Sequence, residues 1–224
     1  MSKKRKNKKP RIDWLNHSLE FSVVLIGILI AFQLNKCSNN ITQEELVENH
    51  ITELKLESDE NISRLENGIT HSKQQLIKAD SLLNYIVKRG DANTIKTLSA
   101  ELLDLRSVSI KMDAYKVLTE SGDIRFINRF NDKRSIILLY EQYTEVKKVN
   151  ENAQKIYDDF YYPYIKDNFD LVNWNANNDE LLEEIKNYYS KEFGNLVSTY
   201  RFMLNAKIKT YEKTLLKTRN YLEK

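Results

Sequence analysis

The sequence predicts an all-α protein in which an N-terminal transmembrane helix precedes an elongated helical-bundle or coiled-coil domain. Three observations support this prediction: an apolar run follows a basic start, apolar residues then recur every three or four positions, and no stretch alternates with a period of two. The 224 residues include only five Gly and two Pro. That composition argues against a Gly-rich phosphate-binding loop and against most turn-rich β-sandwiches.

The formal net charge of +3 is unevenly distributed along the chain. Residues 1–20 contain seven Lys and Arg against Asp13 and Glu20, a net of +5, which leaves −2 for residues 21–224. The body is therefore slightly acidic. The basic tail, residues 1–14, has no docking domain beside it that would favour nucleic acid. We predict the lipid bilayer as a partner and no nucleic-acid partner.

The apolar run forms the predicted transmembrane helix, residues 15–36. Its core, residues 21–32, is shorter than the roughly 20 residues that cross a bilayer, so the span extends back to Leu15. A cleaved signal peptide is the first alternative, but no small-x-small site follows the core. A lipoprotein signal is the second, but Lys36 precedes Cys37 where a small residue is needed. An uncleaved anchor fits best.

The charges that flank the span predict its orientation. Seven cations precede it, whereas only Lys36 and Lys55 lie in the 20 or so residues that follow, together with four glutamates. The positive-inside rule places the N-terminus in the cytoplasm and the rest of the chain outside it. In a bacterium with two membranes, we expect an inner-membrane protein with a periplasmic C-terminal domain.

One face of the predicted span carries small residues and an acid. Glu20, Gly27 and Ala31 share this face at 100° per residue, and Gly27-x-x-x-Ala31 is a small-x-x-x-small pair of the kind that lets two helices approach closely. We expect these residues to take part in membrane helix packing. Glu20 is either solvated at the cytoplasmic interface or an intramembrane acid in an ion pathway.

A short linker, residues 37–41, leads into an all-helical domain, residues 42–224. Thr42 and Glu45 form a capping-box signature, and apolar or small residues recur from Val47 to Ile86 with one irregularity near Ser58. Shorter helices are predicted from residue 93 or 94 to 106 and from 109 to 121. Longer ones are predicted over 133–168 with a kink at Pro163, over 179–193, and over 195–221. The simplest architecture pairs the 42–87 helix antiparallel with the last one.

The stretch Glu20-Phe-Ser-Val-Val-Leu-Ile-Gly-Ile-Leu-Ile-Ala-Phe-Gln-Leu-Asn35 resembles the signature of an uncharacterised, domain-of-unknown-function family of bacterial single-span membrane proteins. In that family a Glu stands seven residues before Gly-Ile-Leu-Ile-Ala-Leu-Gln-Ile-Asn, the spacing of Glu20 and Gly27. The segment 115–127 resembles a second family motif with a Leu-x-x-Ser-Gly core. Cys37 departs from the family's Trp. The resemblance implies a retained anchor and a topology, but no chemistry.

The sequence contains no convincing catalytic constellation. His50 and His71 are three heptads apart on one predicted helix, which separates them by about 31 Å and excludes a shared metal ion. Arg64 and His71 match a loose Arg-x(4–6)-His pattern of small helical ribonucleases, but apolar Leu65 stands where that pattern has a polar residue. We predict no catalytic, cofactor-binding or metal site, and no cofactor.

Aromatic residues cluster around Pro163. Seven rings fall within 18 residues: Tyr157, Phe160, Tyr161, Tyr162, Tyr164, Phe169 and Trp174. Tyr and Trp are favoured at interfaces because they combine a large area with a polar tip. The cluster predicts either a partner surface, with Tyr157, Tyr161, Tyr162, Tyr164 and Trp174 as its residues, or packing at the end of the bundle.

These observations favour a non-enzymatic scaffold or adaptor that works in a homo-oligomer or with a membrane-protein partner. A ligand-sensing helical module that signals through a partner subunit is the alternative, because the cytoplasmic tail is too short for an output domain. A helical ribonuclease-like toxin ranks below both.

Overall fold

The computed structural model describes residues 14–170 and 182–223, and within those residues every regular element is a helix. The chain divides into two units, Met1–Asn49 and His50–Lys224. The elements in order are α1 (Trp14–Lys88), α2 (Ala92–Glu101), α3 (Asp113–Glu120), η1 (Asp123–Phe126), α4 (Phe130–Ile156), η2 (Tyr157–Tyr161), α5 (Tyr162–Asn168), α6 (Leu182–Tyr188) and α7 (Lys191–Leu222). The predicted all-α class is confirmed.

Helix α1 continues through the predicted linker at residues 37–41. The hydroxyl of Thr42 donates to the carbonyl of Ser38 (3.0 Å), which is a bond to the preceding turn of the same helix and not an N-cap. The boundary between the two units falls after Asn49. The predicted linker and helix start at Thr42 are therefore wrong. A capping-box pattern cannot act as a cap where the backbone before it is already helical.

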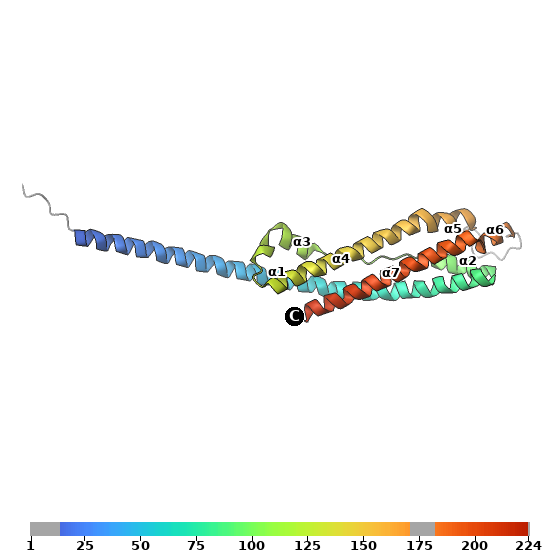
Figure 1. The fold of residues 1–224 in the computed structure, drawn as a ribbon, viewed down its shortest axis with the longest axis horizontal. Coiled ribbons are helices and arrows are strands. Elements are labelled where there is room, and N and C mark those ends of the chain that lie inside the picture. Colours follow the sequence, from blue (N-terminus) through green and yellow to red (C-terminus); the bar gives the residue numbers. More distant parts are fainter. Residues whose placement is uncertain (1–13, 171–181, 224) are drawn as a thin grey trace, which may run out of the picture. The chain divides into compact units, whose positions relative to one another are not determined.

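The second unit is built on three long helices, the C-terminal part of α1 with α4 and α7 (Figure 1). Ion pairs join Glu66 to Arg219, Lys73 to Glu212 and Asp80 to Arg201, so residue numbers rise along α1 as they fall along α7. The two helices are antiparallel, as predicted from sequence.

The buried residues of these helices follow alternating steps of four and three. On α1 the line comprises Leu54, Ser58, Asn61, Leu65, Gly68, Ser72, Gln75, Ala79, Leu82 and Ile86, all buried except Gly68, which is half-buried. On α7 it comprises Phe193, Val197, Tyr200, Leu204, Lys207, Tyr211, Thr214, Thr218 and Tyr221. The irregularity predicted near Ser58 is absent from this line, because its regular positions include polar residues and a glycine that an apolar pattern overlooks.

The kink at Pro163 takes the form of a π-helix, η2, which lies between α4 and α5. Proline has no amide hydrogen, and its ring clashes with the carbonyl four residues earlier. A π-helical turn relieves that conflict by shifting the hydrogen-bond register by one residue. The last helix begins earlier than predicted, at Lys191, because Ser190 caps it by accepting from the amide of Phe193 (3.0 Å).

Candidate functional site

Within the first unit, α1 exposes apolar side chains on all of its sides. An 18-residue window has a mean hydropathy of 1.8, and none of it is buried. Phe21, Ile28 and Leu34 are 67%, 62% and 66% exposed. By length and composition, this is the one candidate membrane span within the residues that the structure describes.

The small-residue face predicted in this segment is accessible. Glu20, Gly27 and Ala31 are all exposed, and a Cβ added at Gly27 would have no atom within 4 Å. A second helix could therefore approach this face without meeting a side chain of its own chain. Association through Gly27 and Ala31 stays a prediction.

Part of the aromatic cluster packs inside the second unit. Tyr161 is fully buried, its hydroxyl donates to the carbonyl of Ser99 (3.0 Å), and its ring centroid lies 4.8 Å from that of Tyr200. The hydroxyl of Tyr157 donates to the carbonyl of Leu103 (3.1 Å), and the ring of Tyr164 stacks on Phe193. These three rings pack the end of the bundle, which was the alternative to a partner surface.

The exposed part of the cluster is small. Tyr162 is 45% exposed and Phe160 is 59% exposed, side by side with the buried rings of η2 and α5. Trp174, which the sequence also assigned to this surface, lies outside the described residues. Tyr157 and Tyr164 are half-buried, so a partner surface at this end of the bundle stays a prediction.

The main unpredicted feature is an extended segment, residues 103–112, that links α2 to α3. The sequence predicted helices ending at 106 and starting at 109, and both predictions are wrong over these residues. The backbone N–H and C=O groups of this segment are not paired in a helix or a sheet. Its polar groups bond to side chains from the three long helices and η2. The segment therefore occupies the place that a fourth helix would take in a bundle.

Helix α1 supplies three of the side chains that hold this segment. The amide of Asn61 bonds Lys111 twice, donating to its carbonyl and accepting from its N–H, both at 2.9 Å. The guanidinium of Arg64 donates to the carbonyl of Ser109 (3.2 Å), and the imidazole of His71 donates to that of Asp104 (3.0 Å). The ribonuclease-like pair, Arg64 and His71, thus bonds to the backbone of residues 103–112.

Helices α4 and α7 supply the deepest contacts. Asn150 donates to the carbonyl of Val108 (2.8 Å) and accepts a hydrogen bond from the hydroxyl of Tyr211. The ammonium of Lys207 donates to the carbonyl of Arg106 (2.6 Å), and its side chain is fully buried. Burial lowers the pKa of Lys207 to about 8, because a low-dielectric site disfavours the charged form.

These contacts assign a structural purpose to the polar residues in the buried lines. A backbone carbonyl or amide buried without a partner costs about 1–3 kcal/mol, so an extended segment inside a bundle requires side-chain partners. Asn61, Asn150 and Lys207 provide them. The signal in the sequence is faint, since Asn61 and Lys207 stand at regular positions of the buried lines on α1 and α7, and Asn150 is a buried polar residue on α4.

Asn61→Ala is expected to lower the free energy of unfolding by about 2–3 kcal/mol, because it removes both hydrogen bonds to Lys111 and leaves buried backbone groups without partners. The matched control is Asn84→Ala on the exposed side of α1, which we expect to stay within about 0.5 kcal/mol of wild type. Chemical unfolding measures both values, and hydrogen exchange should show faster exchange of the Lys111 amide in Asn61→Ala only. Equal stability of the two variants would contradict the assignment.

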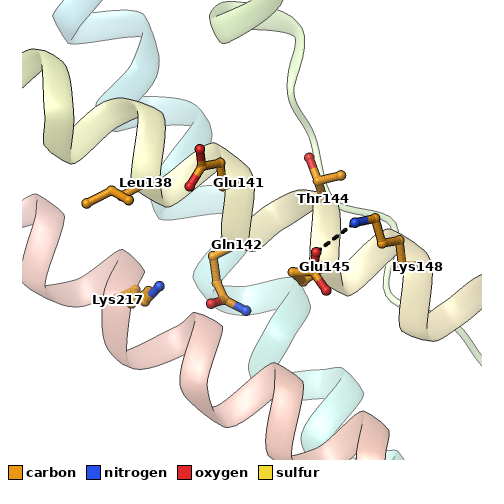
Figure 2. A pocket seen from close by; sticks show the side chains of 7 residues that line it. All are labelled: Leu138, Glu141, Gln142, Thr144, Glu145, Lys148 and Lys217. Atoms are coloured by element: carbon orange, nitrogen blue, oxygen red, sulfur yellow. Dashed lines mark hydrogen bonds and ion pairs between the residues drawn. The ribbon is translucent and has the colours of Figure 1, made fainter.

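An open hollow lies between α4 and α7 in the second unit, with a volume of about 350 Å³. Figure 2 shows its lining: Leu138, Glu141, Gln142, Thr144, Glu145, Lys148 and Lys217. Lys148 donates to Glu145 (2.8 Å), which holds the pKa of that carboxyl below its usual range. Two acids, Glu141 and Glu145, and two lysines, Lys148 and Lys217, line the hollow. It offers no enclosed site for a small molecule.

No group of three or more metal-ligating side chains comes together within the described residues. His50 bonds Asp123 (3.1 Å) at one end of the second unit, and His71 bonds the extended segment. The two histidines therefore have separate partners, consistent with their distance along α1.

Comparisons with known protein-family models, with curated proteins and with solved structures each gave no match for this chain.

Proposed function

We propose that the chain is a single-span protein of the bacterial cytoplasmic membrane that presents residues 50–224 on the far side as a non-enzymatic scaffold or adaptor. The supporting observation is the apolar surface of α1. Eleven large apolar side chains between Leu19 and Leu34 are at least 48% exposed. Burying each would stabilise the chain by about 1.5–3 kcal/mol, which in sum exceeds the roughly 5–15 kcal/mol stability of a typical domain. Immersion in lipid removes this surface from water.

The direction of insertion follows from the basic tail, residues 1–14. Its seven cations favour the cytoplasmic side, whereas only Lys36 and Lys55 lie in the 20 or so residues that follow the span. The resemblance of residues 20–35 to a family of single-span proteins supports the same topology. In this arrangement Cys37 stands just outside the membrane on the periplasmic side.

A scaffold role is favoured over catalysis by how the second unit is filled. Its interior is occupied by its own extended segment and by tyrosines whose hydroxyls bond carbonyls, for example Tyr200 to Leu102 (2.9 Å). The regular four-and-three spacing of buried residues on α1 and α7 is typical of coiled-coil packing, which we propose for these helices. Contacts with a second copy or a membrane partner would then use the Gly27 and Ala31 face.

The native Cys37 provides a direct test of topology, because it is the chain's single cysteine. We expect a membrane-impermeant maleimide to label Cys37 in intact spheroplasts. The control variant, Ser2→Cys in a Cys37→Ser background, should be labelled only after lysis. The reverse pattern would overturn the orientation, and release of the protein by alkaline carbonate would overturn the anchor.

The scaffold role is tested separately by crosslinking in cells. We expect a crosslinked dimer or a crosslinked membrane partner for wild type, reduced when Gly27→Leu and Ala31→Leu block close helix approach. The control is Val23→Leu, which keeps an apolar side chain on the span and leaves the two small residues in place. A chain that stays monomeric, with no crosslinked partner, would contradict the scaffold role and leave the topology standing.

A further inference from the structure

A basic and aromatic corner stands out on the second unit. It is formed by η1 and the first turns of α4 and comprises Arg125, Phe126, Arg129, Phe130, Lys133 and Arg134. Phe130 is 72% exposed, and the three arginines are exposed. Between residues 124 and 134 the chain has four cations and a single carboxylate, Asp132. We call these six residues the basic corner.

The cations of the basic corner differ from many others on this unit in lacking a close carboxylate. Within the described part of the chain, no ion pair within 4.0 Å involves Arg125, Arg129, Lys133 or Arg134. By contrast, Lys73, Lys78, Lys111, Lys148, Arg201 and Arg219 each have one. Arg125 lies over the ring of Phe126 (4.6 Å to its centroid).

The acids at this end of the unit neutralise the basic corner only in part. Asp123 accepts from His50 (3.1 Å) and also interacts with Arg125, and Asp132 lies between Arg129 and Lys133 in the sequence. Glu120 lies 3.9 Å from Lys116. The corner therefore presents a net positive charge with an exposed phenyl ring between arginines. Such a combination suits an anionic interface that also accepts apolar groups.

The position of the basic corner along the chain ties it to the predicted span. The bond between His50 and Asp123 joins η1 to the first residue of the second unit. His50 lies fourteen positions after Lys36, the end of the predicted span, which corresponds to about 21 Å of helix. This short tether limits how far the basic corner can lie from the surface of the bilayer that holds the span.

We propose that the basic corner binds the anionic phospholipid headgroups of the membrane in which the chain is anchored. The arginines and Lys133 pair with headgroup phosphates, and Phe130 enters the boundary between headgroups and acyl chains. Binding is intramolecular once the span is inserted, so a weak surface interaction suffices. This inference rests on the proposed membrane anchorage.

The test uses the full chain in lipid nanodiscs, one chain per disc, with an environment-sensitive fluorophore. The fluorophore is attached at Asn128→Cys, which lies on the corner, in a Cys37→Ser background. The control site is Phe202→Cys, which is also exposed. Its neighbour Arg201 pairs with Asp80, which lies 30 positions after His50 on α1, so this site is distant from the basic corner. Headgroup-bound nitroxide lipid serves as quencher.

In phosphatidylglycerol discs we expect quenching of about twofold at position 128 and none at position 202, because anionic headgroups attract clustered cations. In phosphatidylcholine discs quenching at 128 should be absent. About 1 M NaCl should abolish it, since the Debye length falls to about 3 Å. Exchanging Arg125, Arg129, Lys133 and Arg134 for Glu should also abolish the quenching at position 128. If that variant misfolds, the salt dependence of the wild-type corner still tests the proposal.

Equal quenching at position 128 in the two lipids, or equal quenching at positions 128 and 202, would overturn the proposal. Quenching that appears only with two chains per disc would overturn it in favour of contact with a second copy. Failure of the chain to co-elute with discs would overturn the membrane anchorage itself, and that result is distinct from a chain that enters the disc without quenching.

Discussion

Gly68→Ala is expected to lower the free energy of unfolding of the second unit by about 2–3 kcal/mol, although alanine is the better helix former. Gly68 is the half-buried member of the regular line on α1, at the point where the extended segment crosses. A Cβ placed there would stand 2.0 Å from Cγ2 of Val108 and 3.2 Å from Cε2 of Tyr211. Alanine therefore forces the segment outward.

The neighbours of Gly68 cannot move without breaking buried hydrogen bonds. The hydroxyl of Tyr211 bonds Asn150, and Asn150 in turn donates to the carbonyl of Val108 (2.8 Å). A shift of Val108 or Tyr211 breaks this chain of hydrogen bonds inside the core. We therefore expect the larger Gly68→Val to be worse than Gly68→Ala.

Gly194→Ala is the matched control, since Gly194 also lies in a long helix. Its added Cβ would meet Cγ2 of Ile86 at 3.7 Å, which is an ordinary contact. The helix propensity gained should raise the free energy of unfolding by about 0.5–1 kcal/mol. Urea unfolding of the full chain in mild detergent, followed by far-UV circular dichroism, compares the three proteins. Opposite signs are expected for the two variants, and the same sign would contradict the close packing at Gly68.

The helices that the sequence predicted best are those with an apolar period and local boundary residues. The end of α1 near Lys88 and the kink at Pro163 depend on residues within one turn, so they are readable locally. The antiparallel pairing of α1 with α7 follows from two long amphipathic patterns. These features need no knowledge of distant contacts.

The extended segment, residues 103–112, was not predictable in the same way. Residues 109–121 have a helical pattern, but only Asp113–Glu120 forms a helix there. What holds the preceding residues extended is a set of side chains distant in sequence, such as Asn61, 50 residues from Lys111, and Lys207, 101 residues from Arg106. Tertiary hydrogen bonds override local propensity here.

The same cause explains why the sequence pattern does not identify the buried polar groups of the candidate site. Asn61 and Lys207 look like surface residues when only hydropathy is considered, and Tyr161 looks like an interface aromatic. All three are buried: Asn61 and Lys207 bond carbonyls of residues 103–112, and Tyr161 in the π-helix donates to the carbonyl of Ser99 in α2. A polar residue at a regular buried position was the signal, and it becomes informative only once that position is known to face another chain segment.

Lys207 makes the stability of the second unit rise with pH, which is the second large effect that we expect. Its side chain is fully buried and donates to the carbonyl of Arg106 (2.6 Å), and burial lowers its pKa from the ordinary lysine value of about 10.5 to about 8. Between these two pH values the unfolded chain binds more protons than the folded chain. The free energy of unfolding therefore increases as pH rises, by about 2 kcal/mol between about pH 7 and pH 9.5.

The buried tyrosines set the upper limit of this pH window. Burial raises the pKa of Tyr211 and Tyr221 to about 12, so their contribution to stability is present below pH 10 and is lost as pH rises through 12. Their effect has the opposite sign to that of Lys207. Measurements up to about pH 9.5 isolate the lysine.

Lys207→Met should remove the pH dependence. At pH 7 the variant loses the hydrogen bond to Arg106 but no longer buries a charge, so its stability should lie within about 1–2 kcal/mol of wild type. At about pH 9.5 wild type should be the more stable of the two by a margin about 2 kcal/mol larger than at pH 7. Lys209→Met, an exposed neighbour on α7, should keep the wild-type rise. If Lys207→Met showed that rise as well, the buried ammonium would not be its source, and another group with a depressed pKa would have to supply it.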